Sequence, residues 1–160
     1  MKMAKENKTN AMRKLEGMKI AYTGHTFEVL DDMTGVDTAR ILGEDPERVF
    51  KTLVTESRSG NHYVFLVPVA EELDLKKAAM AVGEKSVSML KSKELLPLTG
   101  YVHGGCSPIG MKKFFRTTIH HTAAGYDTIF FSGGRRGFQI ELPLSSLKKV
   151  IEFELADLIK

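Results

Sequence analysis

Short extended runs separated by turn residues constrain the fold of this chain more than any other feature. Residues 51–55 and 62–69 are two such runs, joined by the hairpin-like segment Glu-Ser-Arg-Ser-Gly-Asn. Residues 128–131 and 138–142 form a second pair around a glycine-rich turn. Strict alternation of strands and helices is missing, which disfavours a doubly wound parallel sheet. The pattern predicts an α+β fold around a mixed, mostly antiparallel sheet with flanking helices.

Helices are predicted between these runs from capping residues, apolar spacing and terminal glycines. They lie at residues 9–16, 38–42, 74–82 and 91–96, the last one stopping at Pro97. Extended structure is predicted at residues 20–30, broken at Gly24, and at residues 117–121. Residues 144–160 carry apolar side chains at helical spacing, which predicts a closing amphipathic helix.

The length of 160 residues corresponds to a single domain that spans residues 1–160. A hydrophobic fraction of 42% and a charged fraction of 27% are ordinary for a globular protein and exclude disorder. The longest apolar run, residues 64–70, is far shorter than the ~20 residues that cross a bilayer. The first residues are too charged for a signal peptide. We therefore expect a soluble, cytoplasmic protein without a membrane partner.

The formal net charge is only +3, but basic residues occur in pairs along the chain. These pairs are Lys76-Lys77, Lys112-Lys113, Arg135-Arg136 and Lys148-Lys149. Such pairs are typical of ordinary solvated surface and also of a surface that faces a polyanion such as nucleic acid. Charge by itself leaves both interpretations open.

Two glycine-rich segments stand out. Gly100–Gly110 contains four glycines, a proline and a serine between a predicted helix and a predicted strand. Glycines let a backbone approach a ligand closely and let successive N–H groups converge on one oxygen. Ser132–Gly137 adds two arginines that suit a phosphate. Each segment is also compatible with an ordinary connection or a hairpin turn.

A few side chains could carry chemistry. Lys51 begins an apolar strand, so its ammonium either reaches solvent or lines a binding site. Cys106 is the single cysteine, which excludes an intrachain disulfide, and no basic partner makes it a nucleophile. Ser107 lacks the Gly-x-Ser-x-Gly context of a nucleophilic serine. His120 and His121 are adjacent in a predicted strand, so they should point to opposite faces, and no metal site is predicted.

Three ordered segments together resemble the YbaK family, the free-standing relatives of the editing insertion in bacterial prolyl-tRNA synthetases. They are Val-Phe-Lys-Thr-Leu at residues 49–53, the Gly-Gly-Cys-Ser-Pro-Ile-Gly segment within residues 99–113, and the Ser-Gly-Gly-Arg-Arg-Gly segment within residues 129–142. Residues 68–79 are also similar, so the resemblance runs almost from end to end. Three motifs in this order are more specific than any single glycine-rich loop.

The resemblance implies a barrel-like α+β fold and a Cys-tRNA(Pro) deacylase that acts on the acceptor end of aminoacyl-tRNA beside prolyl-tRNA synthetase, without metal or cofactor. It also implies that the thiol of the substrate attacks its own ester carbonyl, while the protein orients the substrate and stabilises charge. The same activity can extend to Cys-tRNA(Cys). Alternatives are removal of another small aminoacyl group such as that of Ala-tRNA(Pro) by water, and a non-catalytic module that binds tRNA or the synthetase.

Site residues follow from the same resemblance, with Lys51 as the catalytic residue. The implied substrate-binding residues are Phe27, Thr52, Gly104, Gly105, Ser107, Pro108, Gly110, Ser132, Gly133, Gly134, Arg136 and Gln139. We expect the N–H groups of Gly104 and Gly105 to face the ester carbonyl, and Lys51 to contact the terminal adenosine or the substrate amine. Family members often carry tyrosine in place of Phe27 and aspartate in place of Gln139, so this chain lacks a hydroxyl and a charge at these positions.

Overall fold

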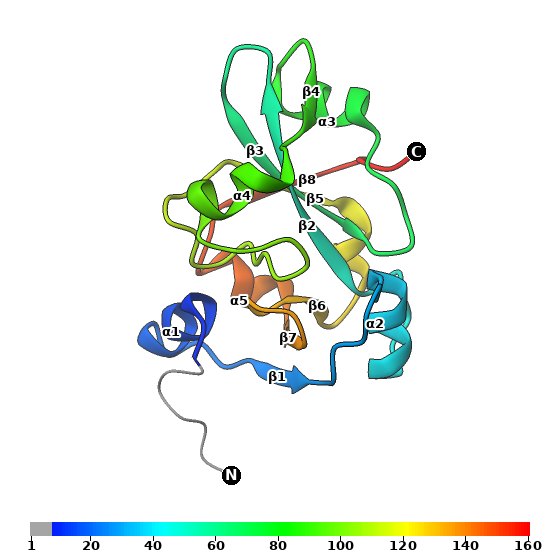
Figure 1. Cartoon of the computed structure of the whole chain (residues 1–160), viewed down its shortest axis with the longest axis vertical. Helices are drawn as coiled ribbons and strands as arrows, with labels where there is room; N and C mark the ends of the chain where they lie inside the picture. Colours follow the sequence, from blue (N-terminus) through cyan, green and yellow to red (C-terminus); the bar gives the residue numbers. More distant parts are fainter. Residues whose placement is uncertain (1–7) are drawn as a thin grey trace.

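The computed structural model describes residues 8–160, which form two β-sheets and short helices (Figure 1). The strands are β1 (Thr23–Thr26), β2 (Phe50–Ser57), β3 (His62–Pro68), β4 (Val87–Met89), β5 (Thr117–His120), β6 (Ile129–Ser132), β7 (Phe138–Leu142) and β8 (Phe153–Ala156). One sheet has the order β4-β2-β3-β5-β8 and the other the order β1-β7-β6. All pairs are antiparallel except β3 with β5 and β5 with β8. The predicted mixed, mostly antiparallel α+β fold is confirmed.

The sheets are not closed into one barrel. They meet where Val49 and Phe130 form an isolated parallel bridge, with the N–H of Phe130 donating to the carbonyl of Arg48 at 3.2 Å. This single bridge joins the start of β2 to the middle of β6 without extending into a full ladder. The barrel-like part of the prediction is therefore corrected to two open sheets that touch at one edge.

The helices are α1 (Asn10–Gly17), α2 (Gly35–Leu42), α3 (Leu75–Val82), α4 (Ser92–Thr99) and α5 (Leu144–Lys148), with a 3₁₀ helix η2 (His121–Gly125). The side chains of Thr9, Thr34 and Asp74 accept hydrogen bonds from the first turns of α1, α2 and α3. Gly43 and Gly83 end α2 and α3 with φ of 70° and 73°, a conformation that favours glycine. None of the helices within residues 8–160 has the length and apolar character needed to cross a membrane.

Two helix predictions need correction. The predicted helix over residues 144–160 ends at Lys148, and the chain then forms β8, which pairs in parallel with β5. The open edge of β5 offers backbone partners to this segment, so tertiary context overrides the apolar spacing. The helix predicted to stop at Pro97 continues to Thr99, whose hydroxyl donates to the carbonyl of Leu95 at 2.8 Å.

The cores lie on both faces of the five-stranded sheet. The larger core fills the space between the two sheets and includes Phe50, Leu66 and Phe131. A second core packs α3 against Phe65 and Val67 on the opposite face of β3. A third, small core of Ala39, Val49 and Phe130 fixes α2 over the bridge between the sheets, with Leu42 and Val69 packed against it.

Candidate active site

Lys51 and Ser132 lie on the same side of two adjoining strands. The bridge between Val49 and Phe130 aligns β2 with β6, and side chains in strands point alternately to opposite faces. Lys51 and Ser132 lie two residues further along their strands than Val49 and Phe130. Their side chains therefore point to the same side as those of Val49 and Phe130. Phe50 points the other way and is buried between the two sheets.

The register of the smaller sheet extends this surface. Ser132 lies opposite Gln139 in the pairing of β6 with β7, and Gln139 lies opposite His25 in the pairing of β7 with β1. Opposite residues in an antiparallel pair share a face. We call the surface formed by Lys51, Ser132, Gln139 and His25 the Lys51 face. Four strands contribute one side chain each, and β1, β2 and the hairpin of β6 and β7 are distant from one another in sequence.

Lys51 is half-buried in β2 opposite Val67. Burial lowers the pKa of its ammonium group, while the negative charges of Glu72 and Glu71 partly oppose this shift. A partly desolvated ammonium forms stronger hydrogen bonds and ion pairs than one in bulk water. Lys51 is thus suited to hold an oxygen atom of a ligand.

Gln139 has an unsatisfied acceptor on the same face. Its side-chain carbonyl oxygen Oε1 is buried and has no hydrogen-bond partner among residues 8–160. Buried polar atoms nearly always have a partner, so this oxygen is a candidate acceptor for a ligand donor. Phe27 lies just beyond the end of β1, where its N–H donates to the carbonyl of Gly137 at 3.0 Å. This bond continues the pairing of β1 with β7 by one residue pair, so Phe27 extends the Lys51 face.

Thr52 does not join this group. It lies opposite Leu66 in the pairing of β2 with β3, and Leu66 belongs to the core between the sheets. Its hydroxyl oxygen is buried without a partner among the described residues. Because neighbouring residues of a strand point to opposite sides, the side chain of Thr52 faces away from that of Lys51.

The two glycine-rich segments pack directly against each other. A Cβ atom added to Gly105 would lie 2.9 Å from the Cα atom of Arg135 and 3.0 Å from the backbone nitrogen of Arg136. A Cβ atom on Gly104 would lie 3.4 Å from Nε of Arg136. The absence of a side chain at Gly105 therefore allows the two backbones to touch, and the motifs form one junction.

Three backbone donors at this junction are already used. The N–H of Gly105 donates to the carbonyl of Val102 at 3.0 Å, and the N–H of Gly133 donates to the carbonyl of Phe138 at 2.8 Å. The N–H of Gly134 donates to the hydroxyl of Ser132 at 3.2 Å. The expectation that the Gly105 N–H faces a substrate carbonyl is therefore not supported, because the turn that shapes the loop uses this donor.

Ser107, Pro108 and Gly110 support the loop from inside. Ser107 is fully buried, and its hydroxyl accepts a hydrogen bond from the N–H of Ile109 at 3.2 Å. Pro108 is also buried, and a Cβ atom on Gly110 would lie 2.9 Å from the backbone nitrogen of Ala11 in α1. These residues hold the loop against α1, whereas Gly104 and Arg136 remain exposed at the surface.

Cys106 is buried in the same loop. Burial raises the pKa of its thiol to about 12, and a hydrogen bond with Thr99 opposes this only in part. The thiol is therefore protonated at neutral pH, and the thiolate is the form that reacts as a nucleophile.

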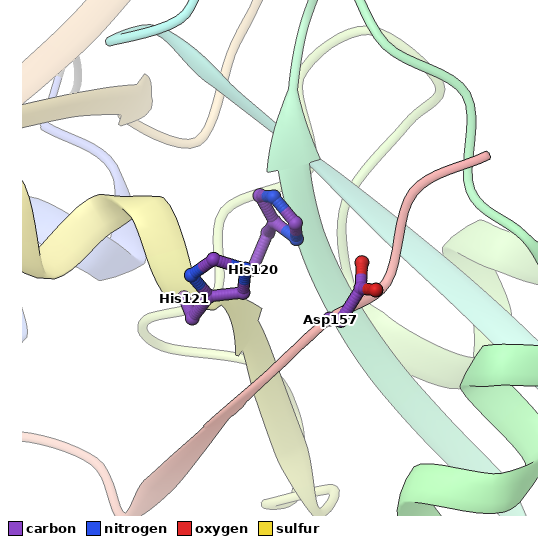
Figure 2. Close-up of side chains that lie close together, drawn as sticks. All are labelled: His120, His121 and Asp157. Carbon is purple, nitrogen blue, oxygen red and sulfur yellow. The ribbon is translucent and has the colours of Figure 1, made fainter.

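His120 and His121 lie close together, against expectation (Figure 2). Their ring centroids are 4.5 Å apart, because His121 starts η2 and leaves the alternation of β5. Together with Asp157 they offer three ligand atoms within 4.8 Å of one another. However, Nδ1 of His120 accepts a hydrogen bond from the N–H of Leu158 at 3.1 Å, and Asp157 pairs with Lys77 at 2.8 Å. Because Nδ1 of His120 accepts from Leu158, Nε2 carries the proton of the neutral imidazole. Neither ring nitrogen can therefore bind a metal unless the hydrogen bond from Leu158 breaks.

The Lys51 face also carries a polar network that the sequence did not predict. His25 bonds to Glu141 at 2.8 Å, and the same carboxylate accepts a hydrogen bond from Thr128 at 2.6 Å. Alternation along β7 places Glu141 on the same face as Gln139, and this much can be read from the sequence. The partner of Glu141 was not predictable, because β1 and β7 are far apart in the chain.

Comparison with known proteins shows the family to which the chain belongs. The aminoacyl-tRNA editing domain matches residues 31–150. The chain belongs to the aminoacyl-tRNA editing domain family. This confirms the resemblance found from the motifs around Lys51 and in the two glycine-rich segments, all of which lie within the matched residues.

The editing domain has relatives of two kinds. It is 42% identical over 154 residues to the candidate Cys-tRNA(Pro)/Cys-tRNA(Cys) deacylase EbsC of Enterococcus faecalis, covering 96% of the chain and 94% of that protein. It is 31% identical over 83 residues to a proline–tRNA ligase of Pelobacter propionicus, covering 51% of the chain and 14% of the ligase. In fold it matches the crystal structure of a candidate trans-editing enzyme for prolyl-tRNA synthetase, with a TM-score of 0.82, 22% identity and 99% coverage of both chains.

Proposed function

We propose that this editing domain removes cysteine from mischarged Cys-tRNA(Pro), and also from Cys-tRNA(Cys), as a free-standing enzyme. The Lys51 face carries this proposal, since it combines a partly desolvated ammonium with an unsatisfied amide oxygen of Gln139. The likeness to EbsC over nearly the whole chain supports the same substrate. The aminoacyl-tRNA acceptor end and prolyl-tRNA synthetase are the proposed partners.

The reaction is proposed to use the thiol of the substrate. Its sulfur attacks the ester carbonyl carbon, a C–S bond forms, and the bond between that carbon and the 3′ oxygen of the tRNA breaks. Lys51 donates to an oxygen of the ester or of the terminal adenosine, because a protonated substrate amine would repel its ammonium. The amine instead donates to Oε1 of Gln139. The protein thus contributes orientation and charge stabilisation.

The test of this function is a panel of tRNA(Pro) samples charged with radiolabelled cysteine, alanine, serine or proline. We expect rapid release of cysteine and much slower release of serine, whose hydroxyl is a weaker nucleophile of the same shape. Faster release of alanine than of cysteine would indicate attack by water instead. Release of none of the four would contradict a deacylase and favour a binding module.

Cys106 is expected to be dispensable for this reaction. Cys106→Ala should deacylate Cys-tRNA(Pro) within about threefold of the wild-type rate, because the buried thiol is protonated and the reacting sulfur belongs to the substrate. The loss of a small buried group should lower the free energy of unfolding by about 1 kcal/mol. Single-turnover deacylation and thermal unfolding measure the two effects. A thioester trapped on Cys106 would contradict the prediction.

The isolated domain is expected to discriminate poorly between tRNAs. Its net charge of +3 provides few phosphate contacts, so binding should be weak and its dependence on salt shallow. We expect Cys-tRNA(Pro) and Cys-tRNA(Cys) to be cleaved at similar rates by the protein alone, and added prolyl-tRNA synthetase to favour the proline tRNA. Strong discrimination without the synthetase would show that this domain reads the tRNA itself.

A further inference from the structure

His25 is held in one orientation on the Lys51 face by the network around Glu141. Its ring nitrogen Nε2 lies 2.8 Å from Oε1 of Glu141. The other carboxylate oxygen accepts from the hydroxyl of Thr128 at 2.6 Å and lies 3.6 Å from NH2 of Arg48. The Arg48 guanidinium also donates to the carbonyl of Thr128 at 2.9 Å. Both oxygens of Glu141 are therefore engaged, and the carboxylate is not a free ligand for substrate.

The ionised state of Glu141 determines which nitrogen of His25 carries the proton. Burial raises the pKa of Glu141, but the hydrogen bonds from Thr128 and His25 and the charge of Arg48 outweigh this, and the net pKa is below the ordinary value. An ionised carboxylate only accepts, so Nε2 of His25 donates and Nδ1 keeps the lone pair. Nδ1 has no hydrogen-bond partner among the described residues.

The ring of His25 is accessible and reaches across the smaller sheet to Phe130. Its centroid is 5.2 Å from that of Phe130, although β7 lies between β1 and β6. The ring therefore leans from the edge strand β1 across the sheet, toward the strand that adjoins β2 and Lys51. Its side chain is 31% exposed, so a bound ligand can reach it.

We propose that His25 is the proton acceptor and donor of the deacylation, oriented by Glu141. This inference rests on the proposed function. Nδ1 takes the proton from the thiol of the substrate as the sulfur attacks the ester carbonyl carbon. The imidazolium then gives this proton to the 3′ oxygen of the tRNA as the carbon–oxygen bond breaks, so that the ring returns to its neutral form. A free alkoxide is a poor leaving group, and the transferred proton removes that difficulty.

Charged groups of both signs lie around the ring of His25. Glu141 faces it from β7 and stabilises the imidazolium, as the carboxylate does in other histidine–carboxylate pairs. Arg48 contacts Glu141 and Phe130, and Lys51 lies on the same face with Glu71 and Glu72 nearby.

The experiment compares His25→Gln and His25→Ala with His62→Gln as a matched control. His62 is also a half-buried histidine beside a glutamate and a phenylalanine, with Nε2 3.9 Å from Glu56 and its ring 5.9 Å from that of Phe115. Single-turnover release of cysteine from Cys-tRNA(Pro) is measured across pH, with and without added imidazole. Thermal unfolding of each variant accompanies the kinetics.

We expect His25→Gln to slow release by about a hundredfold to ten-thousandfold and to lose the acid-side fall in rate that titration of an imidazole causes. Imidazole should restore part of the rate of His25→Ala, and His62→Gln should stay within about threefold of wild type. His25→Gln retains an N–H donor for Glu141, so it serves if the alanine variant is unstable. A His25→Gln rate near that of wild type, or a loss that keeps the wild-type pH profile and resists imidazole, overturns the proposal. A wild-type protein that releases no cysteine overturns the proposed function, and this role with it.

Discussion

Replacing Lys51 by alanine is expected to reduce deacylation of Cys-tRNA(Pro) by at least about a hundredfold, the effect of losing one positioned donor in a partly desolvated site. Lys51→Met should be equally inactive, because it keeps the aliphatic stem and lacks only the ammonium. Both variants should unfold within about 1 kcal/mol of wild type, since burial already disfavours the charge that they remove. Single-turnover kinetics and thermal unfolding measure the two quantities.

Lys85→Ala is the control for this prediction. Lys85 is exposed and is not part of the Lys51 face. Its loss tests whether any lysine of this weakly basic domain matters through general attraction to tRNA, and we expect little change in rate. Lys51→Met with full activity would remove the ammonium from the mechanism. A large loss of stability in both Lys51 variants would instead indicate a structural role.

Replacing Gly105 by alanine is expected to lower stability strongly, because this glycine lies where the two glycine-rich segments touch. The new methyl group would lie 2.9 Å from the Cα atom of Arg135 and 3.1 Å from its carbonyl carbon, and backbone atoms cannot rotate away as a side chain can. The loop and the turn must therefore separate. Overpacking of this kind costs about 3 kcal/mol, which corresponds to a melting temperature lower by roughly 6–12 °C for a chain of this size.

Gly125→Ala is the matched control, because a Cβ atom there meets nothing within 4 Å. Its melting temperature should stay within about 2 °C of wild type. We also expect Gly105→Ala to deacylate more slowly, since displacement of the turn carries Ser132 out of line with Lys51. A stable and fully active Gly105→Ala would show that the two segments do not need to touch.

Local patterns in the sequence predicted much of the fold. The capping residues Thr9 and Asp74 and the glycines after α2 and α3 mark helix ends, and these signals act within a few residues of the chain. The two hairpins were predicted for the same reason, because a tight turn joins strands that are already neighbours. Helical spacing misled the prediction after Lys148, where the open edge of β5 takes up β8.

The site was predictable in part. The segment around Lys51 and the two glycine-rich segments identified the family from sequence, and Lys51 itself lies on a face with Ser132 and Gln139. Thr52 follows Lys51 in the sequence but faces the opposite way. The contact between the two glycine-rich segments could not be predicted. A glycine-rich pattern indicates that another group comes close to the backbone, but it does not indicate which group.

By itself, the sequence determined several helix ends, the two hairpins and the family, and it predicted a role for Lys51. Only the tertiary structure decided which strands adjoin and therefore which side chains meet. His25 and Glu141 are 116 positions apart, and their pairing depends on β1 lying beside β7. An alternating pattern shows that a strand has a buried face, but it does not identify the neighbouring strand. The reason is that the backbone hydrogen bonds between strands are the same whatever the side chains.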